Sequence, residues 1–215
     1  MSDEISNKYE IWQGPDLLHS ADEFEAGDLF RIQQAQSHTI ELRCRNGERA
    51  ELIAYVIGES NELPALLKAH GQRVPKGPAD VMLRQQVLRD SKGERFAWVL
   101  IIEISAEGVI KGCRQNLWVG DFDHVVMYVE RSDEGDIVNI EKPFSPDAQH
   151  DFLITYDRDL GVTDIAEFIH DSDDYYLDDL MPMFDDPRFY TDAVALPSTL
   201  GPQARIPDLP PFPRN

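Results

Sequence analysis

The sequence has few of the features that are typical of extracellular or membrane proteins. Its 215 residues include only two cysteines, too few for a framework of disulfide bonds. The longest hydrophobic run, Ala97–Ile102, is six residues long, far short of the roughly 20 that a membrane-spanning helix needs. The first ten residues lack the apolar stretch of a secretory signal peptide. We therefore expect a cytoplasmic protein that is not embedded in a membrane.

Positive charge is also scarce. Twenty lysines and arginines stand against forty aspartates and glutamates, so the formal net charge is −20. Nucleic-acid backbones and anionic membrane surfaces are polyanions and would repel such a chain. We therefore expect no direct binding to nucleic acid or membrane, and a basic protein as the partner. The sequence leaves the oligomeric state open.

Motifs of known enzyme classes are missing as well. The sequence contains no G-x-S-x-G nucleophile elbow, no H-E-x-x-H pair, no Walker loop and no G-x-G-x-x-G. The six histidines show no metal-ligand spacing, and the arginines beside Cys44 project to the opposite face of the expected strand from its thiol. We predict no catalytic residue, no cofactor and no metal ligand, and thus a protein that is not an enzyme.

One acidic stretch resembles the start of a calcium-binding loop but does not complete it. Asp171, Asp173 and Asp174 occupy the first, third and fourth positions of such a loop. Tyrosines stand at the fifth and sixth positions, where a ligand and a glycine are needed, and no glutamate stands at the twelfth. A divalent-metal-dependent enzyme is therefore kept only as an alternative.

The first two-thirds of the chain has the pattern of β-hairpins. An alternating run over 38–45 and a returning strand over 48–57 flank Asn46-Gly47, which is a turn signal. A three-residue loop ending at Gly47 would pair Leu42 with Ala50 and keep the apolar side chains on one face. We predict this loop, with a bulge, for the hairpin.

Two helices and a meander are expected to follow the hairpin. Apolar spacing predicts a short helix over 63–70, and Asp80 as a cap predicts a second helix over 80–88, through Leu83, Val87 and Leu88. Four runs of strand length, separated by turn-prone residues such as Glu107-Gly108 and Gly120-Asp121, then predict successive strands over 96–104, 109–119, 122–130 and 137–141. Their connections are too short for crossover helices, so we predict an antiparallel meander rather than a parallel sheet.

The C-terminal third is predicted to add a strand over 150–156 and a helix over 164–169, the latter from the capping-box spacing of Asp164 and Glu167. A helical stripe then ends or kinks near Pro182. Its members are Leu177, Leu180, Met181 and Phe184. Six of the last nineteen residues are proline, which favours an extended segment.

These patterns together predict an α+β fold, with an antiparallel, hairpin-rich sheet flanked by two or three short helices. We expect a single domain over residues 1–192, whose C-terminal segment 151–192 is acidic. An extended proline-rich tail over 193–215 follows it.

The acidic segment carries the functional signal. Residues 151–192 contain thirteen acids and only two cations, Arg158 and Arg188, which gives a charge of −11. Such crowding of carboxylates is relieved by solvent, by cations or by a basic partner. One interpretation is a solvated polar face with its aromatic side chains packed inward. The other is a surface that docks a cationic protein, with carboxylates steering the encounter and tyrosines as anchors.

The second interpretation predicts a non-enzymatic acidic binding protein, of the antidote or immunity type, that inhibits a basic toxin or nuclease. An adaptor or structural subunit that uses the proline-rich tail as an arm is a further alternative. The partner-binding residues predicted by the leading hypothesis are Asp171, Asp173, Asp174, Tyr175, Tyr176, Asp178, Asp179, Asp185 and Asp186.

Overall fold

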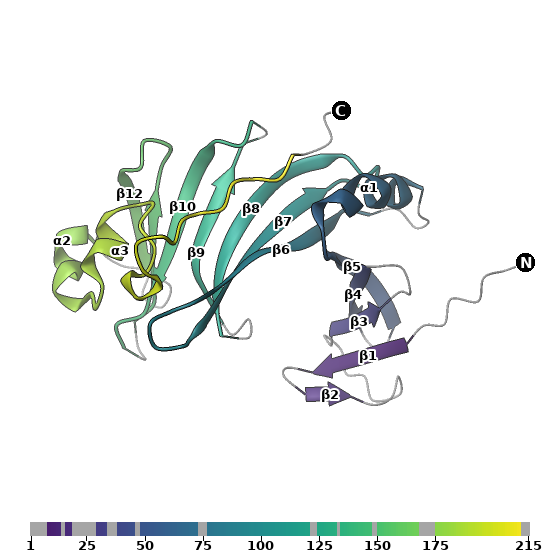
Figure 1. Cartoon of the computed structure of the whole chain (residues 1–215), viewed down its shortest axis with the longest axis horizontal. Helices are drawn as coiled ribbons and strands as arrows, with labels where there is room; N and C mark the ends of the chain where they lie inside the picture. Colours follow the sequence, from purple (N-terminus) through teal and green to yellow (C-terminus); the bar gives the residue numbers. More distant parts are fainter. Residues whose placement is uncertain are drawn as a thin grey trace, which may run out of the picture. The chain divides into compact units, whose positions relative to one another are not determined.

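The structure is a computed structural model in which β-strands predominate among the described residues and the helices are few and short, which fits an α+β fold (Figure 1). It describes residues 8–13, 16–18, 29–33, 38–45, 48–72, 77–120, 124–132, 134–147, 150–167 and 175–211. Two compact units divide the chain. The N-terminal unit comprises Met1–Leu83, Ile101–Lys111 and Pro210–Asn215, and the C-terminal unit comprises Arg84–Leu100 and Gly112–Leu209. The single domain ending at residue 192 stays a prediction.

In the N-terminal unit the hydrogen-bonded strand order is β2-β1-β3-β4-β5-β6. The strands are β1 (Lys8–Gln13), β2 (Asp16–Leu18), β3 (Leu29–Gln33), β4 (His38–Arg45), β5 (Glu48–Ile57) and β6 (Ala79–Arg89). β5 and β6 pair in parallel, so the sheet is mixed. The prediction of a purely antiparallel sheet was therefore wrong. The chain between them is long enough for a crossover and contains helix α1 (Leu63–Gly71), the helix predicted from its apolar spacing.

The hairpin of β4 and β5 differs from the prediction in its loop. Arg45 pairs with Glu48, so two residues rather than three connect the strands. The register shifts between Cys44 and Arg43, so Leu42 lies opposite Leu52 and not opposite Ala50, and it shifts again between Leu42 and Glu41. Each shift places an extra residue in one strand. Bulges in β5, and not a longer loop, therefore set the register of this hairpin.

The C-terminal unit contains the predicted antiparallel meander. The strand order from β6 onward is β6-β7-β8-β9-β10-β11-β12, of which β9 to β12 belong wholly to this unit and β6 to β8 only in part. The strands after β6 are β7 (Arg95–Ile104), β8 (Ile110–Val119), β9 (His124–Arg131), β10 (Ile137–Phe144), β11 (Phe152–Tyr156) and β12 (Val162–Glu167). Antiparallel pairing is seen from β8 through β12. The predicted strands over 96–104, 109–119, 122–130, 137–141 and 150–156 are confirmed within a few residues at their ends.

Two predicted helices are strands, and both predictions were wrong for the same reason. In β6 the buried residues Ala79, Val81 and Leu83 alternate with more exposed ones, which is the period of a strand. In β12 the side chain of Ile165 is buried and its two neighbours are exposed. Capping residues suggested helices at both places, but neither segment has an apolar stripe of helical period to bury.

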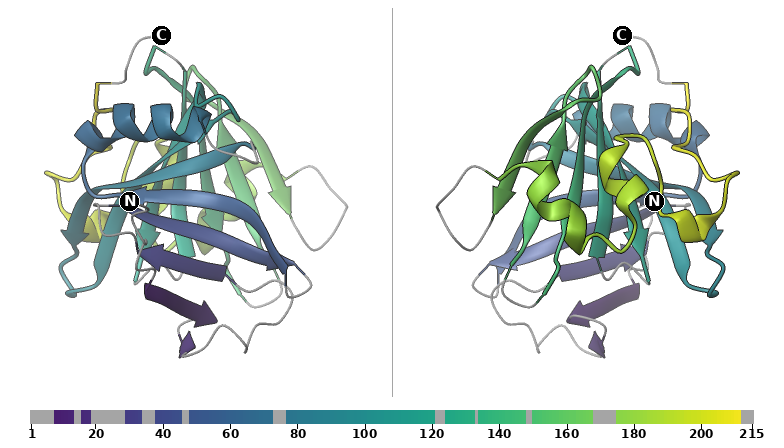
Figure 2. Two further views of the ribbon diagram at one scale, coloured as in Figure 1. Left: turned by 90° about the vertical axis from the view of Figure 1, so that its right-hand side faces the viewer. Right: turned by 90° about the vertical axis from the view of Figure 1, so that its left-hand side faces the viewer.

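Short helices cover one face of the meander (Figure 2). They are α2 (Leu177–Leu180), the 3-10 turn η3 (Met181–Met183), α3 (Pro187–Thr191) and the 3-10 turn η4 (Ser198–Leu200). Leu180, Phe184 and Phe189 pack in one apolar core with sheet residues such as Trp98 and Ile140. These contacts give the helical segment a fixed place on the sheet.

Candidate docking surface

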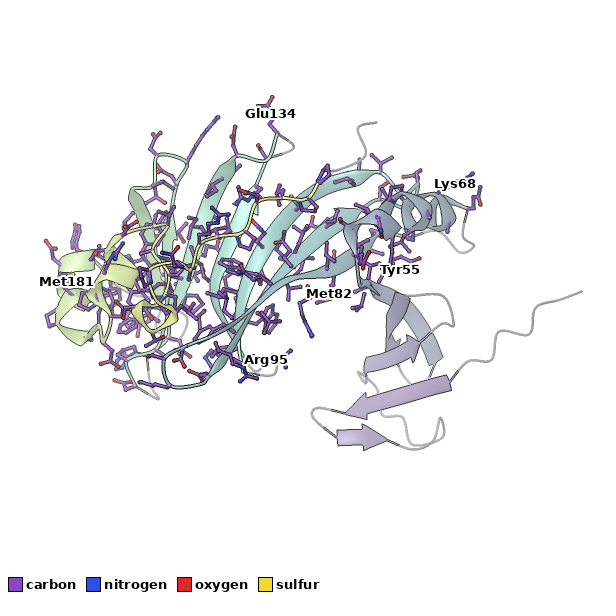
Figure 3. The ribbon with its side chains drawn as sticks, viewed as in Figure 1. Tyr55, Lys68, Met82, Arg95, Glu134 and Met181 are labelled. Atoms are coloured by element: carbon purple, nitrogen blue, oxygen red, sulfur yellow. The ribbon has the colours of Figure 1, made fainter. Side chains whose placement is uncertain are left out.

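The turn from α2 into η3 exposes apolar and acidic side chains together. Buried Leu180 and Phe184 hold this turn against the sheet, and Pro182 prevents α2 from continuing as a regular helix. The side chains between and around them face solvent: Tyr176 is 69 % exposed and Met183 is 51 % exposed. Met181 lies on the same turn and is exposed too (Figure 3). We call the docking surface the six residues Tyr176, Asp178, Asp179, Met181, Met183 and Asp185.

The predicted partner-binding acids divide into groups. Asp171, Asp173 and Asp174 lie outside the described residues. Asp178 and Asp185 are exposed. Within the described part of the chain, neither of these two forms an ion pair with a lysine or arginine. Their carboxylates are therefore open to water and to a partner.

Asp179 and Asp186 have structural contacts. Asp179 Oδ2 accepts a hydrogen bond from the backbone N–H of Tyr176 at 3.2 Å, at the start of α2. Asp186 Oδ1 accepts from the N–H of Phe189 at 3.4 Å, and Oδ2 accepts from the N–H of Ser198 at 2.7 Å. Both carboxylates thus satisfy backbone donors that a helix start or a turn leaves unpaired. Asp179 remains exposed, whereas Asp186 is partly buried.

The two predicted tyrosine anchors have different surroundings. Tyr175 is partly buried, and its hydroxyl donates to Glu167 Oε2 at 2.7 Å. Its ring packs edge-on against Phe152 with 5.1 Å between the ring centroids. Tyr176 is directed to solvent instead. The structure thus gives Tyr175 a packing role and leaves Tyr176 as the exposed aromatic side chain of the docking surface.

A buried lysine lies beneath α3 and was missed from the sequence. Lys142 is 0 % exposed, and its Nζ donates to the backbone carbonyls of Phe189, Asp192 (2.8 Å) and Ala195 (3.0 Å). The ammonium also stands 4.3 Å from the centroid of the Phe189 ring. Lys142 has the same strand phase as the buried residues Ile140 and Phe144 in β10, and this phase is the sequence signal that could have placed it on the inward face.

The surroundings of Lys142 perturb several pKa values. Burial lowers the pKa of Lys142 to about 7, although the nearby carboxylates of Asp192 and Asp186 act in the opposite direction. Burial likewise raises the pKa of Tyr156 above its ordinary value and that of Tyr190 to about 12. The Tyr156 hydroxyl donates to the carbonyl of Tyr190. The segment that follows the docking surface is therefore fastened to the sheet through its backbone carbonyls.

A second polar network fixes the tail against the meander. Gln115 is fully buried, and its Nε2 donates to the carbonyl of Pro207 at 2.9 Å. Arg131 Nε donates to Gln115 Oε1 at 2.7 Å, and Gln85 Nε2 donates to the carbonyl of Asp208 at 3.1 Å. Burial is the main cause that lowers the pKa of Arg131. These hydrogen bonds hold the tail on the meander through its backbone carbonyls.

Neither a candidate metal centre nor a membrane-spanning helix is found among the described residues. In that part of the chain, no three His, Cys, Asp or Glu side chains gather in a way that would hold a metal ion. None of its helices has the length and apolar character to cross a membrane. Comparison with known proteins identifies no family: no family model, no curated protein and no solved structure matches this chain.

Proposed function

We propose that the protein is a non-enzymatic acidic binding protein that docks a basic partner through the docking surface, as an antidote or immunity-type inhibitor does to a toxin or nuclease. The observation that carries this proposal is the exposure of Tyr176, Met181 and Met183 among carboxylates on one turn. Exposed aromatic and methionine side chains are typical interface anchors, and the surrounding charges steer a partner of opposite sign.

The buried contacts beneath the docking surface favour a site that is already formed before a partner binds. Leu180 and Phe184 are buried in the core, and Lys142 fastens the segment that follows through three carbonyls. A surface that is already ordered loses little conformational freedom on binding. The tail is held by Gln115 and Arg131, which favours the binding-protein hypothesis over an adaptor that uses the tail as a free arm.

The test uses a synthetic amphipathic helix of about 18 residues built from lysine and leucine, because it offers charge and apolar contacts together. We compare the wild-type chain with the double variant Asp178→Asn, Asp185→Asn by titration at low ionic strength. Exposed ion pairs are individually weak, so we expect a loss of affinity of about 2- to 30-fold. The loss should shrink at high salt, where exposed charges are screened.

The matched control is Glu130→Gln, Glu134→Gln, which makes the same change in net charge on exposed residues of β9 and the following turn. Glu134 lies well away from Met181 (Figure 3). An equal loss of affinity in both double variants would show that the peptide senses only net charge, and the docking surface would be abandoned. Met183→Ser should weaken binding even at high salt, because it removes an apolar contact.

A further inference from the structure

β12 is the last strand of the meander and has a free backbone edge among the described residues. It pairs with β11 on one side, and no described strand lies on its other side. An edge strand presents unpaired N–H and C=O groups to which another chain can add. The opposite end of the strand order is β2, which has only three residues, against six in β12. β12 is thus the better of the two edges for holding an added strand in register.

The charge of the side chains around β12 determines which kind of strand can add to its edge. Residues 151–167 contain five acids and one cation, Arg158, which is already 3.9 Å from the carboxylate of Asp136. Two apolar side chains, Leu160 and Val162, are 41 % and 37 % exposed beside these acids. A second copy of this chain would bring the same negative charges and be repelled, whereas a basic strand would be attracted.

We propose that the outer edge of β12 accepts an extended, lysine- or arginine-bearing segment of the partner as an added β-strand. The proposal rests on the proposed function and adds the mode of recognition: backbone hydrogen bonds to β12, with basic side chains meeting acids such as Asp164.

The edge is also connected to the docking surface. The Tyr175 hydroxyl donates to Glu167 Oε2 at 2.7 Å, and the Tyr175 ring packs on Phe152 of β11. Tyr175, which immediately precedes Tyr176 and α2, therefore lies beside β11 and β12. A strand added to β12 would have its neighbouring residues within reach of the docking surface.

The experiment separates strand addition from attraction by charge alone. The probe is a peptide of about nine residues in which lysine alternates with valine and threonine, favouring an extended strand. Its matched control has the same sequence with four adjacent central residues N-methylated, which removes backbone donors on both edges and leaves the charge unchanged. We expect the unmodified peptide to bind at least about tenfold more tightly, since several backbone hydrogen bonds are at stake. Exchange of the amide protons of residues 162–167 should slow only with that peptide.

Charge reversal then tests the location. Asp164→Lys should weaken binding of the unmodified peptide, whereas Glu94→Lys, an equal change at an exposed residue in the β6–β7 turn, should leave it nearly unchanged. Equal binding of both peptides, or protection that spares β12, overturns strand addition. In that case a positive result with the lysine–leucine helix still supports the docking surface. Failure of both strand peptides to bind also overturns the inference.

Discussion

Lys142→Met is the substitution that most directly tests how the C-terminal helical segment is held. Methionine is of similar length and apolar, so it fills the same space without a charge or donors. Of the three carbonyls that Lys142 contacts, that of Asp192 also accepts from the N–H of Ala195. The carbonyls of Phe189 and Ala195 would lose the donor that the structure shows for them. A buried acceptor left unsatisfied costs about 1–3 kcal/mol, so the two together predict a loss of about 2–6 kcal/mol.

The size of this loss should depend on pH. The pKa of Lys142 falls from 10.5 in the unfolded chain to about 7 in the folded one, so the unfolded chain binds more protons between those values. The free energy of unfolding of the wild type therefore rises with pH in that window. From pH 6 to pH 9 the gain is about 2–3 kcal/mol, which Lys142→Met cannot show. A neutral amine keeps two N–H donors, enough for the carbonyls of Phe189 and Ala195.

Urea unfolding of both proteins between pH 6 and pH 9 measures the difference directly. The destabilisation caused by Lys142→Met should be largest at pH 9 and smaller by about 2–3 kcal/mol at pH 6. If Lys142→Met lowers the free energy of unfolding by the same amount at every pH from 6 to 9, the three carbonyls keep Lys142 protonated despite its burial. The pKa argument would then be refuted. The Tyr190 hydroxyl, with a pKa raised to about 12, does not titrate in this window.

Two further predictions concern the N-terminal unit. Gly108 has φ +78°, and a Cβ there would lie 2.2 Å from the carbonyl oxygen of Leu67, so Gly108→Ala should lower the free energy of unfolding by at least about 2 kcal/mol in urea unfolding. Gly93→Ala has the same left-handed backbone without a neighbour within 4 Å and separates strain from clash. Tyr55 OH lies 2.9 Å from His70 Nδ1, and His70 Nε2 lies 2.9 Å from the carbonyl of Gly77. Because Nε2 must donate to that carbonyl, Nδ1 accepts from Tyr55, and Tyr55→Phe should cost about 1–3 kcal/mol by the same assay. No loss would show that the bond is unimportant.

The sequence predicted the meander well because its strands satisfy two independent rules. β7 to β11 are apolar-rich runs of strand length, and turn-forming pairs separate β7 to β10 at hairpin spacing, so pattern and connection agree. The parallel pairing of β5 with β6 was not predicted. It depended on assigning 80–88 to a strand, and the capping signal of Asp80 had favoured a helix there.

The candidate site was predicted less completely because composition does not show which carboxylate is used internally. Asp178 and Asp179 are adjacent in sequence and chemically alike, yet only Asp179 accepts a hydrogen bond from the start of α2. Tyr175 and Tyr176 are neighbours that face opposite surroundings. Lys142 could be placed on the inward face from its strand phase, but its acceptors come from residues about fifty positions later, which only the tertiary fold brings together.

The distribution of these contacts makes stability and association separable in this protein. Between residues 175 and 192 the acids that accept backbone hydrogen bonds are Asp179, Asp186 and Asp192, the last from the N–H of Val194 at 3.2 Å. Among the described residues, the buried cation in contact with this segment is Lys142, and its Nζ donates to carbonyls and not to carboxylates. Folding therefore does not draw on the charges of Asp178 and Asp185, and replacing them with asparagine should leave the urea midpoint unchanged or slightly raised through reduced repulsion. Any loss of affinity in that variant then measures the interaction with the partner alone.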